Sequence, residues 1–383
     1  MIMTINHLGV TLSGLTFEPF GFITAATGFT LLSGYMYAFT SPAKAPTLGT
    51  LAAQSRTRAA KIYRYHIGLF ILLLLPTLLS TVYRDYLNYL YPANENALVA
   101  LAYGAILVHQ PPFMHILPLY LVMSLLSPLM LMALHRGRDA LVLGLSITIW
   151  IIGQSFDPLK WLTTITGIGA SAGQFNLFGW QLLWVAGLYA GFLHRVRNQT
   201  VFFRRSIYFY VAVAIAIGFF LFRHEIFPAP AGLEFYVENS DLRLLRVINT
   251  ISQIVIFCYL IKYVPVTRGL PWLRFLGKYS LQVFTYHVVI VCLLAPISWR
   301  IGPRFGLVAE FIYTVVVLAS MSLPALFYRA YEARQRQNSD RPTWIRKGIA
   351  VKTLAQQLFR FGRNKATVVL ASTKVAEPSR ERM

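Results

Sequence analysis

Charge, and above all negative charge, is scarce in this sequence. Only 13% of its 383 residues are charged, with 14 acidic against 35 basic residues, while 56% are hydrophobic and the mean hydropathy is +0.55. Soluble globular domains typically contain about 25% charged residues and lack apolar runs of about 20 residues. The composition therefore predicts an all-α polytopic membrane protein.

Cysteines and the common catalytic motifs are also scarce or missing. Cys258 and Cys292 are the two cysteines, and both fall in apolar segments, which argues against a disulfide framework or a cysteine metal site. The sequence has no Walker loop, no glycine-rich dinucleotide fingerprint and no His-Glu-x-x-His helix, so nucleotide hydrolysis and zinc proteolysis have no support. His109 and His115 are six residues apart with two prolines between them, which is not a metal-ligand spacing. We expect no metal and no bound cofactor.

Long apolar runs fill most of the chain instead. Windows of about 20 apolar residues predict ten transmembrane helices. The spans are 1–15, 20–40, 64–82, 114–134, 139–156, 177–194, 205–222, 245–263, 276–298 and 305–328. The division that follows is a membrane domain over 1–330 and a basic cytoplasmic tail over 331–383. Within the tail, residues 344–361 fit either an amphipathic helix on the inner leaflet or a disordered basic segment.

The distribution of charge supports this topology. If the tail is cytoplasmic, ten spans place both termini in the cytoplasm. The loops then assigned to the inside sum to +22 and those outside to −1, with only Arg300 and Arg304 against the positive-inside rule. Topology and attraction to anionic membrane lipids explain the basic balance, so no nucleic-acid partner is predicted.

Two outer segments interrupt the simple pattern of spans. Residues 96–110 are too short to cross separately and predict a re-entrant or interfacial helix that ends in His109-Gln-Pro-Pro112. Residues 157–176 are rich in glycine and threonine and predict a flexible loop that covers a cavity. We expect residues 157–176 and the segment around His109 to His115 to border the entrance for an outer substrate.

His7 is the residue most suggestive of chemistry. It lies in the first predicted span among Leu8, Val10 and Leu12. A titratable side chain inside a span is rare and costly, which makes it a functional-site hypothesis. A neutral imidazole there is suited to remove a hydroxyl proton as a general base, in a reaction that joins a cytosolic anionic donor to an outer acceptor. The alternative is a hydrogen bond to a neighbouring helix that only maintains packing.

Other polar side chains in the spans are expected to converge with His7 on one cavity. Asn6 is its neighbour, and His115, Gln181 and His287 are candidates for binding the substrate, although an interhelical hydrogen bond would also explain His287. Four basic residues that precede or open the third span are candidates for binding the phosphates of the donor. They are Arg56, Arg58, Lys61 and Arg64, and topology alone would also account for them.

Several short stretches carry a family resemblance. They are Ile5-Asn-His7, Phe20-Gly-Phe-Ile-Thr-Ala-Ala, Leu31-Leu-Ser-Gly-Tyr35, Gln110-Pro-Pro, Ile116-Leu-Pro-Leu-Tyr120, Phe175-Asn-Leu-Phe-Gly-Trp-Gln-Leu-Leu-Trp184 and Leu276-Gly-Lys-Tyr-Ser-Leu-Gln-Val-Phe284. In this order and spacing the chain resembles the OpgC-type membrane proteins, a branch of the integral-membrane acyltransferases, over nearly its full length apart from the tail.

The resemblance implies an activity and a location. It implies about ten helices in the bacterial inner membrane and O-acyl transfer, typically of succinyl groups, from a cytosolic acyl-CoA-type donor to osmoregulated periplasmic glucans. The expected partners are membrane lipids, the acyl donor and a periplasmic glycan acceptor. In this superfamily a histidine of the first helix is the catalytic candidate, and that role corresponds to His7, with Asn6 beside it.

Three departures from the family pattern bear on activity. Related proteins carry an arginine about one helix length before the histidine, and the chain begins too late to contain it; the first span has about 15 residues where about 20 are needed. We expect a misplaced start codon, with a truncated protein as the alternative. Thr27 and His115 stand where similar proteins tend to carry acids, which leaves His7 without an orienting carboxylate.

Two rival functions follow from these departures and from the fold class. One is a transporter or flippase of an acyl or glycan carrier, against which the sequence shows no inverted repeat and no matching pair of broken spans. The other is a catalytically decayed membrane scaffold.

Overall fold

The computed structural model describes residues 1–42, 46–92, 96–167, 169–199, 206–228, 230–261 and 271–339. In these ranges the secondary structure is helical, without strands, which confirms the all-α prediction there. The helices, in chain order, are α1 Ile2–Leu8, α2 Ser13–Thr16, α3 Ala25–Phe39, α4 Leu48–Leu79, α5 Thr81–Tyr86, the 3-10 helix η1 Asn88–Leu90, α6 Ala97–Ala105, α7 Ile116–His135, α8 Asp139–Gly153, α9 Pro158–Thr166, α10 Leu177–Val196, α11 Ser206–Arg223, α12 Leu233–Tyr236, α13 Leu244–Leu260, α14 Pro271–Lys278, α15 Ser280–Ser320 and α16 Ser322–Ser339.

Side-chain caps explain where several of these helices begin. The Asn96 side chain accepts hydrogen bonds from the backbone N–H groups of Leu98 and Val99, both at 3.0 Å, and so starts α6. This helix confirms the prediction of a short helix within 96–110. Asp157 caps α9 in the same way, and Gly167 ends it in the left-handed region with φ 64°. The prediction of a flexible loop over 157–176 is therefore wrong for the part that forms α9.

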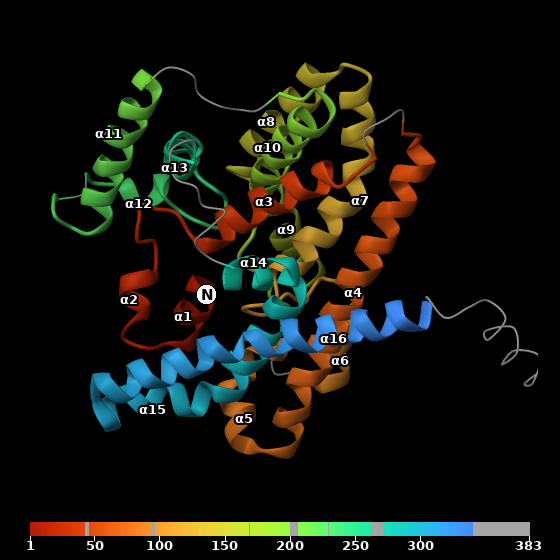
Figure 1. The fold of residues 1–383 in the computed structure, drawn as a ribbon. Coiled ribbons are helices and arrows are strands. Elements are labelled where there is room, and N and C mark those ends of the chain that lie inside the picture. The colour runs from red at the N-terminus through yellow and green to blue at the C-terminus, as the bar shows by residue number, and fades with distance from the viewer. Residues whose placement is uncertain are drawn as a thin grey trace, which may run out of the picture. The chain divides into compact units, whose positions relative to one another are not determined.

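The core is built around α3 and α10, which pack along each other (Figure 1). Glycines make this close approach possible, because a Cβ on Gly187 would lie 1.9 Å from the carbonyl oxygen of Leu31, and one on Gly34 would lie 2.1 Å from that of Trp184. Small residues at such crossings let helix backbones meet in membrane proteins. In the same unit, α4 packs on α7, α8 on α10, and α11 on α13.

Five helical segments are long and apolar enough to cross a membrane. They are Leu48–Leu79, Ile116–His135, Ser206–Arg223, Ser280–Ser298 and Pro303–Gln335, and α8 with α9, bent by 45°, makes a sixth if the two count as one span. The structure thus supports a membrane protein with five or six candidate spans in its described residues. Other predicted windows contain shorter helices, such as α3 with 15 residues and α13 with 17, where about 20 are needed to span.

The first predicted span is interrupted. Its helix α1 ends at Gly9, which adopts φ 67° in the left-handed region, and the chain resumes as the short α2. The long helix α15 is also interrupted. Gly306, with φ 80° and ψ 175°, separates it into two helical parts.

The chain divides into two units, Met1–Ala325 and Leu326–Met383. All the site residues discussed below belong to the first. The amphipathic segment predicted at 344–361 lies outside the described residues, and the predicted boundary at 330 stays a prediction.

Candidate functional site

His7 is positioned by the packing of α1 against α15. The apolar residues that flank it, Leu8 and Val10, are buried and form one cluster with Val291, Val317 and Met321 from the C-terminal helices. Because α1 is only seven residues long, this apolar contact rather than helix propensity holds it in place.

The two histidines of the first and ninth predicted spans meet in the structure. Nδ1 of His7 lies 3.2 Å from Nε2 of His287, and their rings are stacked at 5.4 Å with an interplanar angle of 25°. On its other side, Nδ1 of His287 contacts the backbone carbonyl oxygen of Phe284, one turn earlier in α15. His287 is buried, with 3% of its surface exposed. A chain of polar contacts thus runs from the Phe284 carbonyl through His287 to His7.

The segment between α6 and α7 brings an aromatic ring against His7. The ring of Phe113 lies 4.5 Å from that of His7, and Phe113 has φ 69°. The left-handed conformation costs a residue with a side chain about 1–2 kcal/mol, and strain of this kind clusters at functional sites.

His115 lies at the same site. It is buried and close enough to His7 for an electrostatic interaction between the two imidazoles. Its Nδ1 is buried and makes no hydrogen bond with the residues that the structure describes. Three of the eight histidines of the chain therefore gather at one place, and one of them presents a nitrogen that a ligand hydroxyl can satisfy.

The two segments predicted to border the entrance for an outer substrate lie beside each other. The backbone N–H of Gln110 donates to the carbonyl oxygen of Ser171 at 2.7 Å, and the backbone N–H of Ser171 donates to Nδ1 of His109 at 3.1 Å. His109 in turn donates from Nε2 to the carbonyl oxygen of Leu90 at 3.1 Å. These bonds anchor the segment that carries Phe113 and His115 beside His7.

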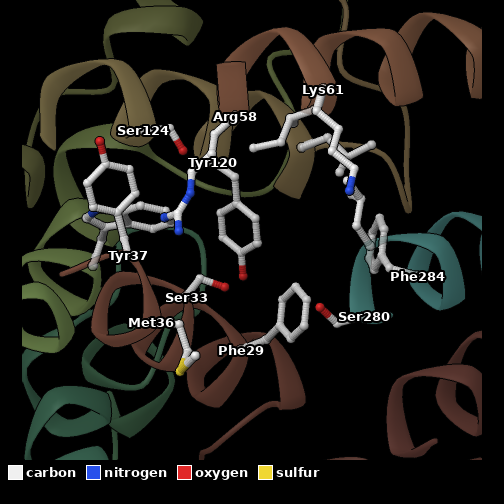
Figure 2. Close-up of a pocket in the computed structure, with 14 residues that line it drawn as sticks. Phe29, Ser33, Met36, Tyr37, Arg58, Lys61, Tyr120, Ser124, Ser280 and Phe284 are labelled. Carbon is white, nitrogen blue, oxygen red and sulfur yellow. The ribbon is translucent and has the colours of Figure 1, made fainter. Parts of the chain in front are cut away.

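A cavity of about 250 Å³ has in its wall Phe284, whose ring lies 4.8 Å from that of His287. Side chains from α3, α4, α7, α10 and α15 line it (Figure 2). Aromatic and aliphatic groups form most of the wall, and hydroxyls and two cations form the rest. The lining residues are Phe29, Ser33, Met36, Tyr37, Arg58, Lys61, Ile62, Leu117, Tyr120, Ser124, Trp184, Ser280, Leu281 and Phe284. Phe284 belongs both to this wall and, through its carbonyl, to the polar contacts of His287.

Two of the four predicted donor-binding residues line the cavity. Arg58 and Lys61 extend into it from α4 (Figure 2). The guanidinium of Arg58 lies 4.7 Å above the ring of Tyr37 and donates to the Thr40 hydroxyl. Arg56 and Arg64 are exposed and are not among the lining residues.

Two other predicted site residues are engaged elsewhere. Asn6 accepts a hydrogen bond from the Thr16 hydroxyl at 2.5 Å, and so ties α1 to α2. Gln181 exchanges hydrogen bonds with Ser146, accepting from the hydroxyl at 2.7 Å and donating to the carbonyl oxygen at 2.7 Å, at the contact of α8 with α10. The structure therefore brings His7, His115 and His287 together, whereas the amides of Asn6 and Gln181 are satisfied by neighbouring helices.

Sequence reasoning missed Glu310 and Phe113. Glu310 is buried, with 2% exposed, and accepts hydrogen bonds from the Thr11 hydroxyl at 2.9 Å and the backbone N–H of Leu12 at 3.1 Å. It thereby fixes the turn that follows α1. An acidic residue inside the last predicted span was a signal for it, but nothing in the sequence indicated the conformation of Phe113.

No metal-binding group is found in the part of the chain that the structure describes. No three histidine, cysteine, aspartate or glutamate side chains there are grouped so that they could hold an ion. The imidazoles of the pair, and a largely apolar cavity with hydroxyls and two cations in its wall, suit proton transfer on an anionic, partly apolar substrate.

These features define an all-helical membrane protein with a histidine pair, His287 buried and His7 partly buried, and a cavity that has two basic side chains in its wall. A family model described as OpgC protein matches residues 1–333, so the chain belongs to the OpgC family. Membership indicates a bacterial membrane protein of the acyltransferase type. No curated protein and no solved structure matches the chain.

Proposed function

We propose that this protein is an inner-membrane O-acyltransferase that moves an acyl group, such as succinyl, from a cytosolic acyl-CoA-type donor to a hydroxyl of a periplasmic glucan or related glycan. The observation that carries the proposal is that one residue, Phe284, belongs to the wall of the cavity and contacts the histidine pair. Phe284 lines the cavity, and its carbonyl contacts the histidine that touches His7.

The size and lining of the cavity suit the acyl end of the donor. Pockets for drug-sized ligands occupy about 300–1,000 Å³, so about 250 Å³ accommodates an acyl thioester and part of its arm but not a whole coenzyme A. Arg58 and Lys61 provide cations for phosphates or for a carboxylate at the end of the acyl group. Arg56 and Arg64, exposed on the same helix, are suited to the nucleotide that remains outside.

The chemistry requires His7 first to accept a proton and then to donate it. His7 accepts the proton of the acceptor hydroxyl while the oxygen attacks the thioester carbonyl carbon. The tetrahedral intermediate then breaks its C–S bond, and the departing thiolate takes the proton from His7. The products are the glycan ester and free coenzyme A. The unpartnered Nδ1 of His115 is suited to hold a hydroxyl of the acceptor near His7.

The use of an acyl-CoA-type donor is tested with the full chain in lipid membranes, to which succinyl-CoA and extracted glucan are added. We expect glucan-dependent release of free thiol together with acyl ester on the glucan. Combining Arg58→Ala with Lys61→Ala removes both cavity cations, so the KM for the donor should rise about 10- to 100-fold, whereas Arg136→Ala, an exposed residue outside the cavity, serves as the matched control.

Three other outcomes of this assay would contradict the proposal. Movement of glycan or acyl carrier across the membrane without thiol release supports a transporter. Folded wild-type protein that releases no thiol and transports nothing supports the decayed scaffold. An unchanged KM for the donor in the double variant would show that the cavity does not bind the donor through Arg58 and Lys61.

We also propose ten spans with both termini in the cytoplasm, on the strength of the charge partition of the loops. Glu234 and Arg136 are exposed in connecting segments expected on opposite sides. In a background with Cys258→Ala and Cys292→Ala, Glu234→Cys should react with an impermeant maleimide added outside, and Arg136→Cys should react only after the membrane is opened. Labelling of both from the same side contradicts the topology.

A further inference from the structure

The contacts on both sides of His287 constrain where its protons lie. Its Nδ1 contacts the carbonyl oxygen of Phe284, and a carbonyl oxygen can only accept. Nδ1 therefore carries the hydrogen, and in a neutral imidazole Nε2 must then be an acceptor. Among the residues that the structure describes, no carboxylate hydrogen bonds to either ring, so no hydrogen-bonded counter-ion supports a permanent positive charge on the pair.

The same reasoning extends to His7. Its Nδ1 lies 3.2 Å from the acceptor Nε2 of His287, so the contact is a hydrogen bond only if His7 carries its hydrogen on Nδ1. The remaining nitrogen of His7, Nε2, then has a lone pair. In the alternative arrangement both rings carry their hydrogen on Nε2. Nδ1 of His287 would then have no hydrogen to donate to the Phe284 carbonyl oxygen.

We infer that His287 is a positioning residue for the proposed acyl transfer: it holds the proton of His7 on Nδ1 and thereby leaves Nε2 of His7 as the atom that accepts the hydroxyl proton. This inference rests on the proposed function for its catalytic consequence. In serine hydrolases an aspartate performs this service for the catalytic histidine; here a neutral imidazole, itself fixed by a backbone carbonyl, takes that place.

The arrangement accounts for the lack of acids noted in the sequence. Thr27 occupies one position where similar proteins tend to carry an acid, and its hydroxyl is paired with that of Thr24 at 3.1 Å rather than with His7. His115 occupies the other. After proton transfer the imidazolium of His7 keeps its Nδ1–H bond to His287, which orients the ring without a buried negative charge.

The activity test compares substitutions that keep or remove the acceptor at this position. His287→Gln places an amide oxygen near the site of Nε2, and we expect it to retain kcat within about 10-fold. His287→Met has similar bulk but no comparable acceptor, and its kcat should fall about 10²- to 10³-fold with the KM for the donor unchanged. Folded protein is quantified in parallel. If His287 only packs, the two variants should have equal kcat per folded molecule, which would overturn the inference.

A second measurement does not depend on activity. In the full chain labelled with ¹⁵N-histidine and reconstituted in lipid, nitrogen shifts distinguish protonated from bare ring nitrogens, and His7→Gln and His287→Gln assign the signals. We expect His7 and His287 each to show a protonated Nδ1 and a bare Nε2. A protonated Nε2 on His7 rejects the inference even if acyl transfer is confirmed. Failure of acyl transfer in the wild type with the expected shifts rejects the proposed function but keeps the proton arrangement.

Discussion

Replacement of His7 by alanine is expected to reduce acyl transfer per folded molecule by about 10²- to 10⁴-fold, the range that a positioned general base contributes. The structure strengthens this expectation because His7 is not a solitary side chain. One ring nitrogen contacts His287 at 3.2 Å, and Phe113 packs against its ring at 4.5 Å. A group held on two sides has little freedom to move away from a bound hydroxyl.

Two variants separate catalysis from packing at this position. His7→Ala removes the ring, while His7→Gln keeps bulk and hydrogen-bonding capacity but supplies no base. Ester on extracted glucan and folded protein in membranes are measured together, and His224→Ala, at an exposed histidine of the chain, is the control. Transfer at the wild-type level by both His7 variants would reject the general base and leave His287 or His115 as the remaining candidates.

The second large effect is expected at Gly187, where α10 meets α3. An alanine Cβ there would lie 1.9 Å from the carbonyl oxygen of Leu31, and contacts under 3.0 Å essentially do not occur. The two helices would have to separate, so packing is lost along an interface that also uses Gly34 and Gly191. Overpacking of this kind typically costs about 1–3 kcal/mol, and Gly187→Val should cost more than Gly187→Ala.

This prediction is measured as the thermal midpoint and folded yield of purified protein in detergent. Gly144 in α8 offers a matched control, because a Cβ there would meet nothing within 4 Å. Gly144→Ala should leave the midpoint unchanged or raise it slightly, since alanine is the better helix former. A wild-type midpoint for Gly187→Val would show that the backbone contact is not close. Because α3 carries Phe29 and Ser33, residual folded protein should also have a weaker donor interaction.

Local sequence was sufficient for the helical class and for several details of it. Apolar runs with few charges determine helices in a membrane, where every backbone polar group must be satisfied within the segment. Asn96 and Asp157 mark helix starts because their short polar side chains reach free backbone N–H groups. His7 was identifiable as a candidate because a titratable group among apolar neighbours is costly unless it has a use.

Which groups surround His7 was decided by tertiary packing. His287 lies 280 positions further along the chain, and only the contact of α1 with α15 brings the two rings together. Phe113 reaches the site through a backbone conformation that its side chain disfavours, which no local propensity predicts. The amides of Asn6 and Gln181 looked equally available in sequence, yet their hydrogen bonds are made with Thr16 and Ser146.

The four basic residues of α4 show the same division. Their sequence positions determine that the segment is positively charged, which fits both the predicted topology and the proposed anionic donor. Only the rotation of α4 against its neighbours decides that Arg58 and Lys61, three residues apart and so on one helical face, line the cavity while Arg56 and Arg64 are exposed. The sequence of a helix determines its charge. Which of its charged side chains face a cavity and which face outward depends on how the helix packs against other helices.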